Sequence, residues 1–514
     1  MQKTLRVMRW TRLWLPVISL ILILTACGAS GGAGKLLVWT GAGVSPDQKT
    51  AATPGQLAYL DGDGKLEPVL DIPAEAEGVS ACGETATSPD GRHFALMVNV
   101  PQGGRDGGTL YQITDGGKPV EVGPAHALSC TGNGTFQYSL DSKQLAYIDY
   151  SEPANNAEYA SGTLRIFSTD QPKQIASYDN VGAFHLGSDS AEFLQYYASN
   201  QNNVDEIAVM IYSNTAANEI ATLFADVNCR YTGAAISPAG GKLAILVGHR
   251  CTNAGTNWQL YTVNRDGGDL TLAMSASQGG GFFPNARTAS LTTGAEDQFI
   301  LFTSADGIAR DTASLYSASM QSLAVDQLTT LITRGAWMQH YTPRAYTVSD
   351  NATPLFSPNR RWWGLVVADT SNPTTLNIID LTATTKSPLT AVADRNQNIS
   401  SMIFAPDSSS VYFVVGGHDG AENTLSRMSL PDGKVTAITA GTFGGGVIAP
   451  DGSALALTVW QKAADTRETL YQNLALVNPS DGSITKTLFQ GVVYKADGTT
   501  VDGLKFAVPL TYRR

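Results

Sequence analysis

The fold is decided by five stretches of one pattern: TSPDGRHFALMV (87–98), ISPAGGKLAILV (236–247), FSPNRRWWGLVV (356–367), FAPDSSSVYFVV (404–415) and IAPDGSALALTV (448–459). In each, a Ser-Pro or Ala-Pro turn is followed by an apolar run, and in four of the five an apolar residue precedes the turn. Proline fixes φ at the first corner of such a turn, aspartate closes it through its side chain, and glycine accepts a positive φ. This turn motif therefore predicts strand–turn–strand units whose polar residues serve turn geometry rather than binding.

The turn motif recurs at roughly fifty-residue intervals along most of the chain. Weaker copies lie at 138–149, 185–197 and 290–304. Many copies are followed by a second strand–turn–strand segment, as at 109–123, 258–274, 375–392 and 424–440. Two hairpins per repeat make a four-stranded antiparallel unit, which is the blade of a β-propeller. We therefore predict an all-β fold, a single β-propeller of eight blades, with seven as the alternative; a count of every copy gives nine.

The two ends of the repeat region indicate how the ring closes. Residues 56–70 resemble the second half of a repeat without a first half, and residues 491–508 resemble a first half without a second. We expect strands from both termini to share one blade.

The turn motifs resemble the WD40-like PD40 repeats of TolB-type propellers, which occur in exported bacterial proteins. The resemblance covers roughly residues 55–510. It implies a propeller fold and contact with other proteins, but it implies no particular activity because the motif lies in the scaffold.

The N-terminus has the pattern of an export signal. Lys3, Arg6, Arg9 and Arg12 precede an apolar run over 13–24 that is short for a membrane span. The run ends in Leu-Thr-Ala-Cys (24–27), which resembles the lipobox of bacterial lipoproteins. The resemblance implies cleavage before Cys27 and acylation of that cysteine, so that the acyl chains anchor the protein to a membrane.

The domain organisation follows from these segments. We predict a signal peptide over 1–26, a flexible Gly/Ala/Ser/Thr-rich tether over 27–54 and the propeller over 55–514. Within the tether, LLVWT (36–40) is expected as an added edge strand. The predicted location is the cell envelope, on the periplasmic or extracellular side of a membrane.

Four further cysteines indicate disulfides in an exported chain: Cys82, Cys130, Cys229 and Cys251. Three pairings are possible. We favour Cys82–Cys130 and Cys229–Cys251 because each pair lies close within the repeat pattern.

The charge argues against nucleic acid as a partner. Removal of residues 1–26 takes away four positive charges and changes the formal net charge from −11 to −15. A chain this acidic lacks the basic surface that phosphate backbones require.

Motifs for chemistry are weak. A G-x-S-x-G match at 28–32 lies in the predicted tether, not on the strand–turn–helix that a nucleophile elbow needs. The segment 61–71 fails the spacing of a calcium loop and reads as a hairpin turn. The six histidines are scattered without metal-ligand spacing. We predict no metal site, no cofactor and no catalytic residue.

The longest break in the repeat, 332–355, is the first candidate for binding. Long insertions in propellers form loops on a face, and Tyr, Trp and Arg are enriched at binding hot spots. Its candidate residues are Arg334, Trp337, His340, Tyr341, Arg344 and Tyr346. Phe282 and Phe283 form a second candidate, whereas alternation along a strand places half of the run 360–363 in the core.

Taken together, the sequence favours a non-catalytic, membrane-anchored propeller lipoprotein that binds a protein partner or serves as a scaffold in the cell envelope. The alternatives are an exported propeller enzyme of the hydrolase, lactonase or lyase kind, and a carbohydrate- or small-ligand-binding module. An enzyme would show acidic and histidine side chains converging on one face, and a carbohydrate module would show the aromatics at 337–346 along an open groove.

Overall fold

The computed structural model describes most of the chain from residue 34 to residue 513. The described residues are 34–41, 55–73, 76, 78–80, 86–100, 107–126, 136–150, 161–188, 190–197, 204–213, 216–225, 229–239, 241–251, 256–272, 274–275, 282–284, 286–293, 298–305, 312–319, 324–332, 355–359, 361–367, 374–383, 387–394, 397–416, 422–462, 470–494 and 506–513. Within these ranges, no helix has the length and apolar character that crossing a membrane requires.

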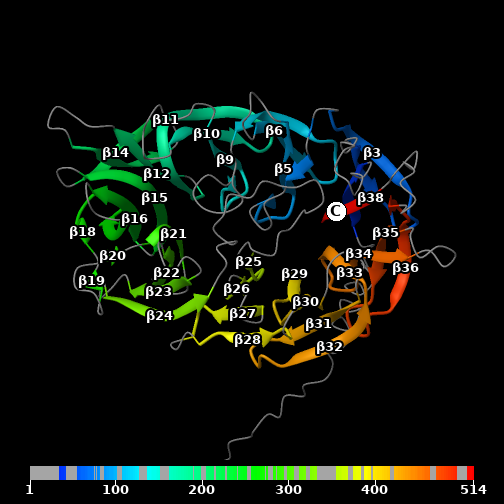
Figure 1. Cartoon of the computed structure of the whole chain (residues 1–514). Helices are drawn as coiled ribbons and strands as arrows, with labels where there is room; N and C mark the ends of the chain where they lie inside the picture. The colour runs from blue at the N-terminus through cyan, green and yellow to red at the C-terminus, as the bar shows by residue number, and fades with distance from the viewer. Residues whose placement is uncertain are drawn as a thin grey trace, which may run out of the picture.

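The described strands form eight sheets arranged in a ring (Figure 1). The closing sheet contains β38 (Phe506–Arg513), β1 (Lys35–Gly41), β2 (Gln56–Leu60) and β3 (Leu66–Asp71). The next contains β4 (Gly78–Ser80), β5 (His93–Asn99), β6 (Gly107–Thr114) and β7 (Val120–His126). A seven-stranded sheet follows with β8 (Gln137–Tyr138), β9 (Gln144–Asp149), β10 (Gly162–Ser168), β11 (Lys173–Leu186), β12 (Ser190–Tyr197), β13 (Glu206–Ser213) and β14 (Ala216–Phe224).

The remaining five sheets continue around the ring. Two five-stranded sheets contain β15 (Cys229–Ala239), β16 (Lys242–Cys251), β17 (Thr256–Asn264), β18 (Thr271–Leu272) and β20 (Phe282–Pro284), and then β19 (Met274–Ser275), β21 (Ala286–Thr293), β22 (Gln298–Ala305), β23 (Thr312–Ser319) and β24 (Ala324–Ile332). Two four-stranded sheets contain β25 (Leu355–Phe356), β26 (Trp362–Val367), β27 (Thr375–Asp380) and β28 (Leu389–Val392), and then β29 (Asn398–Phe404), β30 (Ser410–Gly416), β31 (Asn423–Ser429) and β32 (Val435–Gly441). The last contains β33 (Phe443–Ile448), β34 (Leu455–Lys462), β35 (Leu470–Val477), β36 (Ile484–Phe489) and β37 (Val492–Tyr494).

The repeating unit is an antiparallel meander of four strands in chain order, which confirms the predicted all-β propeller architecture. The seven-stranded sheet joins two such units through β11, which pairs with β10 along its first part and with β12 along its last part. The register shifts between Val181 and Ala183, next to Asn180 with φ 60°. Asparagine tolerates this left-handed conformation, so the chain turns a corner there without leaving the sheet.

Strands from both termini close the ring, as predicted. β38 pairs with β1 from Lys35↔Arg513 to Gly41↔Phe506, and Figure 1 shows the red β38 beside the blue β3 region. We expected each terminus to supply half of the closing blade. Instead, the N-terminal part supplies three strands, and the C-terminal part supplies one. Residues 492–494 belong to the preceding sheet, where β37 pairs with β35.

The stretch LLVWT (36–40) is not an edge strand, and the propeller begins at residue 35 rather than 55. β1 lies inside the closing sheet between β38 and β2. Leu36 to Trp39 are all buried because neighbouring sheets cover both faces of this strand. Because its flanks are rich in glycine and serine, composition alone does not reveal this seven-residue strand.

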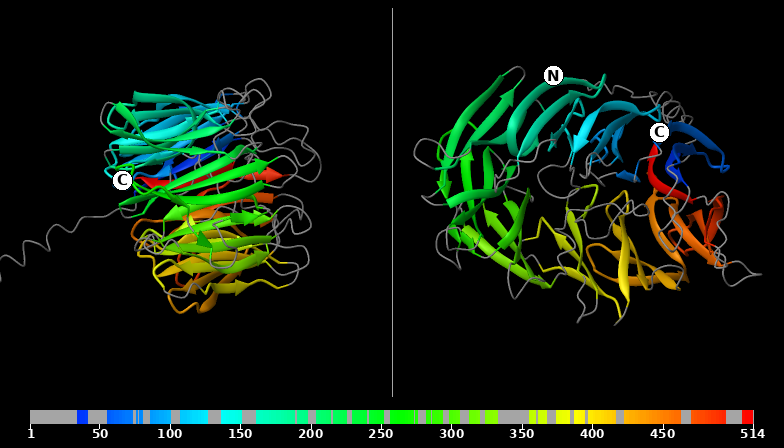
Figure 2. Two further views of the ribbon diagram at one scale, coloured as in Figure 1. Left: turned by 90° about the vertical axis from the view of Figure 1, so that its left-hand side faces the viewer. Right: turned by 45° about the horizontal axis from the view of Figure 1, so that its top comes forward.

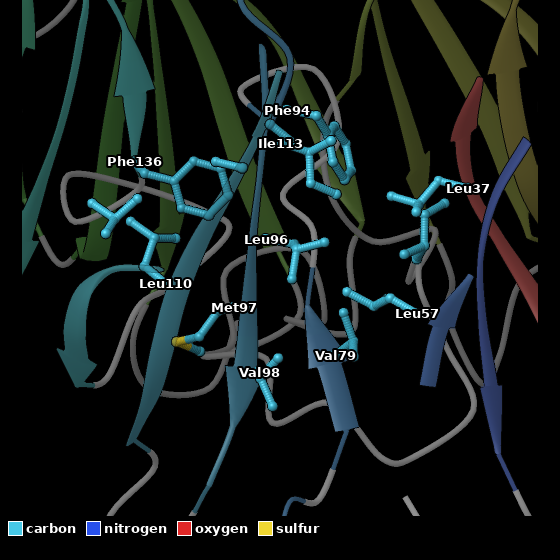
Figure 3. Packing of buried hydrophobic residues seen from close by; sticks show 14 of the residues in the cluster. Leu37, Leu57, Val79, Phe94, Leu96, Met97, Val98, Leu110, Ile113 and Phe136 are labelled. Atoms are coloured by element: carbon cyan, nitrogen blue, oxygen red, sulfur yellow. The ribbon is translucent and has the colours of Figure 1, made fainter. Parts of the chain in front are cut away.

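The core consists of apolar layers between neighbouring sheets. One cluster combines Leu37 and Leu57 of the closing sheet with Phe94 and Leu96 of β5 and with Phe136, and Figure 3 shows Leu96 between Phe136 on one side and Leu37 and Leu57 on the other. Each blade thus buries apolar surface against the next, which is the main stabilising contribution in a ring of this kind.

The ring has two different faces. The "turn face" carries the connections between first and second strands and between third and fourth strands, and the "loop face" carries all others. The C-terminal end of β38 lies at the turn face (Figure 2). The two longest intervals between consecutive strands, 42–55 and 333–354, both leave and re-enter the sheets at the loop face. The two longest connections therefore both belong to the loop face, although the interval 81–92 between β4 and β5 on the turn face also spans 12 residues.

Candidate functional site

The turn motifs act as predicted, as structural elements. Ser88 Oγ donates to Asp90 Oδ1 over 2.6 Å, and the same carboxylate oxygen accepts the amide hydrogen of Arg92 over 3.0 Å. Ser357 and Asn359 repeat this arrangement. The polar atoms of the motif are therefore used within the turn.

Neighbouring turn motifs are also linked to one another. The amide of Asp90 donates to Ser142 Oγ over 3.1 Å, and the amide of Asn359 donates to Ser408 Oγ over the same distance. Ser142 and Ser408 have φ near +60°, at the position that Gly91 and Gly452 occupy in other copies. A left-handed conformation is unfavourable for serine, but at these positions the serine hydroxyl oxygen accepts a hydrogen bond from the preceding blade.

The most enclosed ionic cluster on the turn face is centred on Glu192, which is fully buried. His185 Nδ1 lies 2.9 Å from Glu192 Oε2, and Ser190 Oγ donates to Glu192 Oε1 over 3.0 Å. Arg265, from the next sheet, donates to both Glu192 and Ser190. Burial alone would raise the pKa of Glu192, but the hydrogen bond and charge of His185, the charge of Arg265 and the hydrogen bond of Ser190 hold it below its ordinary value.

The arrangement around Glu192 is not a nucleophilic triad. In a triad the serine hydroxyl contacts the histidine nitrogen, and the acid contacts the other nitrogen. Here Ser190 and His185 both contact the same carboxylate. The geometry instead fixes Arg265 to the preceding blade, so the cluster ties two sheets together.

Two similar ties lie on the loop face. Asp149, 1% exposed, contacts His126 Nδ1 at 2.9 Å and Arg165 at 3.1 Å. Asp205 accepts a hydrogen bond from Tyr196 over 3.0 Å and lies 3.6 Å from Arg230 of the next sheet. A buried carboxylate with an arginine partner is thus a recurring device in this ring.

These clusters were missed by spacing analysis, although one left a signal in the sequence. A hairpin in which the Gly187 amide donates to the Ser190 carbonyl places His185 opposite Glu192, as the register shows. Writing out that register would have found the pair. Arg265 comes from another sheet, and local pairing cannot predict it.

The sequence-predicted binding residues can be placed only in part. Phe282 and Phe283 lie in β20, opposite Gln259 and Trp258 of β17, and their side chains lie outside the description. All six candidates of the insertion fall outside the described residues: Arg334, Trp337, His340, Tyr341, Arg344 and Tyr346. The chain leaves β24 at Ile332 and enters β25 at Leu355. Trp362 and Trp363 are both buried, against the alternation we expected, because sheets pack on both faces of β26.

The cysteines can also be placed in part. Cys27, Cys82 and Cys130 lie outside the described residues. Cys229 forms a disulfide, and Cys251 is its cross-strand neighbour in the β15–β16 ladder. Cross-strand Cα distances lie within the range that a disulfide spans, so the register supports the predicted Cys229–Cys251 pairing. In the described part of the chain, no three His, Cys, Asp or Glu side chains gather as a metal site would require.

The ring of four-stranded meanders and its closure by both termini define the chain as a β-propeller. No protein-family model and no curated protein matches it. Among solved structures it is similar to a eukaryotic initiation factor (12% identity, TM-score 0.48, 92% of this chain and 99% of that chain). It is also similar to prolyl endopeptidases (12%, 0.40, 79% and 55%) and to an oligogalacturonate lyase from Vibrio parahaemolyticus (10%, 0.38, 75% and 95%). Such low identities bear on the fold alone.

Proposed function

We propose that the protein is a lipid-anchored β-propeller of the cell envelope that binds a protein partner through its loop face. The observation that carries this proposal is the asymmetry of the ring. The turn face carries the turn motifs, whose polar groups bind one another, whereas the two longest connections, 42–55 and 333–354, belong to the loop face. Long connections on a rigid scaffold are where binding residues concentrate.

The position of the proposed anchor supports this orientation. Lys35, the first residue of β1, pairs with Arg513 at the turn face. Only residues 28–34 separate Cys27 from Lys35, which corresponds to about 28 Å at full extension. An acylated Cys27 would therefore hold the turn face toward the membrane and direct the loop face away from it.

The insertion 332–355 is the proposed contact segment. It connects the outer strand β24 to the inner strand β25, so it begins and ends on the face directed away from the membrane. Its Trp337, Tyr341 and Arg344 are of the residue types that dominate binding hot spots. The TolB-like character of the turn motifs also favours contact with another protein.

The test of the proposal is photo-crosslinking in the native membranes. A photoreactive residue at Trp337 should capture a partner, whereas the same residue at Leu140 should not. Leu140 is the matched control because it is 67% exposed and lies in a turn-face turn. An affinity purification beside a variant that lacks 334–346 should lose the same partner. Equal capture from both positions, or a partner retained by the deletion variant, contradicts the assignment of the loop face.

Anchoring is tested separately. Cys27→Ser should shift the protein from the membrane fraction to the soluble fraction and remove a lipid-sized mass from the N-terminal peptide. An unchanged distribution between the fractions would refute the lipoprotein proposal but would leave the partner test valid.

The enzymatic alternative requires converging acid and histidine groups. The two histidine–carboxylate pairs of the described residues lie on opposite faces, His185–Glu192 on the turn face and His126–Asp149 on the loop face. Each is joined to an arginine. Neither pair favours the alternative over the binding function.

A further inference from the structure

Two exposed aromatic side chains lie at the loop-face end of one blade. Tyr197 ends β12, and Phe224 ends β14, the strand at one end of the seven-stranded sheet (Figure 1). They are 40% and 59% exposed, and no other Phe, Tyr or Trp side chain in the described part of the chain is as exposed. Scattered apolar residues are normal on a surface, but neighbouring exposed aromatic residues indicate a contact site.

The strand register brings both rings to one side of the sheet. Tyr197 pairs with Glu206 of β13, and Glu206 pairs with Phe224. Directly opposed residues of antiparallel strands project from the same face, and two strand spacings separate the aromatic residues by about 10 Å. Phe193, which has the same orientation as Tyr197 on β12, stacks on Tyr178 of β11 at 4.8 Å. The surface that we call the aromatic rim, made by the side chains of residues 197, 206 and 224, therefore lies on the side of the preceding blade.

Two further carboxylates lie near the aromatic rim. Gln195 Nε2 donates to the carbonyl of Asp179 over 3.0 Å, and the Asp179 carboxylate accepts a hydrogen bond from Thr163 Oγ1 over 3.0 Å. Glu219 accepts a hydrogen bond from Thr222 Oγ1. A neutral hydroxyl leaves the charge of a carboxylate intact, and neither Asp179 nor Glu219 has an ion-pair partner among the described residues.

These groups are linked to the aromatic rim itself. The Tyr197 hydroxyl donates to Gln195 Oε1 over 3.0 Å. Burial raises the pKa of Tyr197, and the negative charges of Glu219 and Glu206 raise it further. The residues that share this face of the three strands include no lysine or arginine: Phe193, Gln195, Tyr197, Glu206, Ala208, Met210, Glu219, Thr222 and Phe224. The aromatic rim therefore combines exposed π faces with a negative field.

A ring face within a negative field attracts a cation in two ways, through the ring quadrupole and through the carboxylates. A guanidinium suits both, because it stacks on aromatic faces and pairs with carboxylates. We propose that the aromatic rim binds an arginine side chain in a basic segment of the protein partner. This inference rests on the proposed function and adds the chemistry of the partner. The formal net charge of −11 also favours encounter with a basic partner.

The experiment measures binding of a fluorescein-labelled peptide of alternating glycine and arginine to the full-length protein in detergent, by fluorescence anisotropy. The same peptide with citrulline in place of arginine keeps the shape without the charge and should not bind. Phe224→Ala should weaken binding of the arginine peptide about threefold, the loss expected for one cation–π contact at an exposed site. Glu219→Gln should weaken it about twofold. Both side chains are exposed, so the melting temperature should not change.

The matched control is the double variant Val120→Ala and Glu121→Gln, compared with the double variant Phe224→Ala and Glu219→Gln. The control also removes one exposed apolar side chain and one negative charge, but from the outer strand β7. It should keep the wild-type affinity for the arginine peptide. Equal losses in the two double variants would mean that the peptide responds only to overall charge. That result, absence of binding to the wild type, or binding of the neutral sugar cellohexaose at the rim in place of the peptide overturns the proposal.

Photo-capture through Trp337 separates this inference from the proposed function. If a partner is captured through Trp337 while the arginine peptide fails to bind, only the arginine contact is refuted. If the peptide binds at the aromatic rim while Trp337 captures nothing, the rim stands and the insertion 332–355 loses its role.

Discussion

The backbone amide of Asp90 donates a hydrogen bond to the side-chain oxygen of Ser142, 52 positions later in the chain. The bond joins the turn motif of one blade to the turn motif of the next. Because Asn359 and Ser408 repeat it on the other side of the ring, the motif that marks the repeat in sequence also couples the repeats in space.

This coupling makes Ser142 a position with two opposing requirements. Its φ of 63° favours glycine by about 1 kcal/mol, whereas its hydroxyl contributes about 1 kcal/mol as an acceptor. We expect Ser142→Gly to be nearly neutral. Ser142→Ala, which keeps the strain and loses the acceptor, should cost about 1–2 kcal/mol. Urea unfolding of the wild type and both variants provides the measurement, and a Ser142→Ala midpoint equal to that of the wild type would show that the hydroxyl contributes nothing.

Local geometry was accessible from the sequence because turn chemistry is local. Pro89, Asp90 and Gly91 specify a turn without reference to any other blade, and the hairpins follow from apolar runs on either side of such turns. Ring closure was predicted in outline for the same reason, since unmatched half-repeats at both ends can only complete one another.

The remaining features depend on contacts between sheets, which local patterns do not encode. Trp362 and Trp363 are adjacent yet both buried, because each blade is covered on two faces. The Glu192–Arg265 tie joins residues 73 positions apart. The strand at Lys35–Gly41 is short, and the segments on either side of it are rich in small residues. Its central position in a sheet becomes clear only from its pairing with β38.

Acid should weaken the Arg361–Asp380 pair in a definite pH range. Burial alone would raise the pKa of Asp380, but hydrogen bonds from Arg361 and Thr382 lower it from 3.8 to about 2. A depressed folded-state pKa contributes stability that is complete above the unfolded value and is lost as the pH falls toward the folded value. The loss between pH 4 and about pH 2 should be about 1 kcal/mol, since Arg361 is partly exposed and screened.

Melting curves of wild type and Asp380→Asn across this range provide the measurement. The variant should be less stable at pH 6, and the difference should shrink on acidification. Asp451→Asn is the control, because the Asp451 carboxylate accepts hydrogen bonds from Ser453 in its own turn and has no ion pair among the described residues. Those hydrogen bonds also lower the pKa of Asp451, so this variant reports the pH dependence that turn hydrogen bonds cause without an arginine partner. A constant difference between wild type and Asp380→Asn at every pH would rule out the charge as its cause.

Removal of the buried carboxylate at Glu192 should be costly. Glu192→Gln keeps the shape but leaves Arg265 and His185 facing a neutral amide, and we expect a loss of about 3 kcal/mol. Arg265→Met should cost less by itself, because that side chain is partly exposed. A double-mutant cycle in denaturant should give a coupling of about 1–3 kcal/mol. Strict additivity of the two substitutions would mean that the tie does not stabilise the ring.

The predicted disulfide can be tested by mapping and by reduction. A non-reduced digest should contain one linked peptide pair that includes Cys229 and Cys251, consistent with their cross-strand register. Reduction, or the double substitution Cys229→Ala and Cys251→Ala, should cost about 3 kcal/mol for a loop of this length. A linkage of Cys229 to Cys82 or Cys130 would contradict the pairing and would require a connection between distant blades.

Removal of the C-terminal strand should have a large effect on stability, because this strand closes the ring. β38 contributes the whole ladder from Arg513 to Phe506 on one side of β1, together with the buried Val508 and Leu510. A chain that ends at residue 505 should expose the edge of β1, and unpaired edges promote aggregation. We therefore expect the truncated protein to melt at a lower temperature and to aggregate, as followed by light scattering. A synthetic peptide of residues 506–514 should bind the open edge and restore the melting temperature, whereas a peptide with the same residues in scrambled order should not. A truncated chain that melts like the wild type would show that the ring does not depend on β38 for its closure.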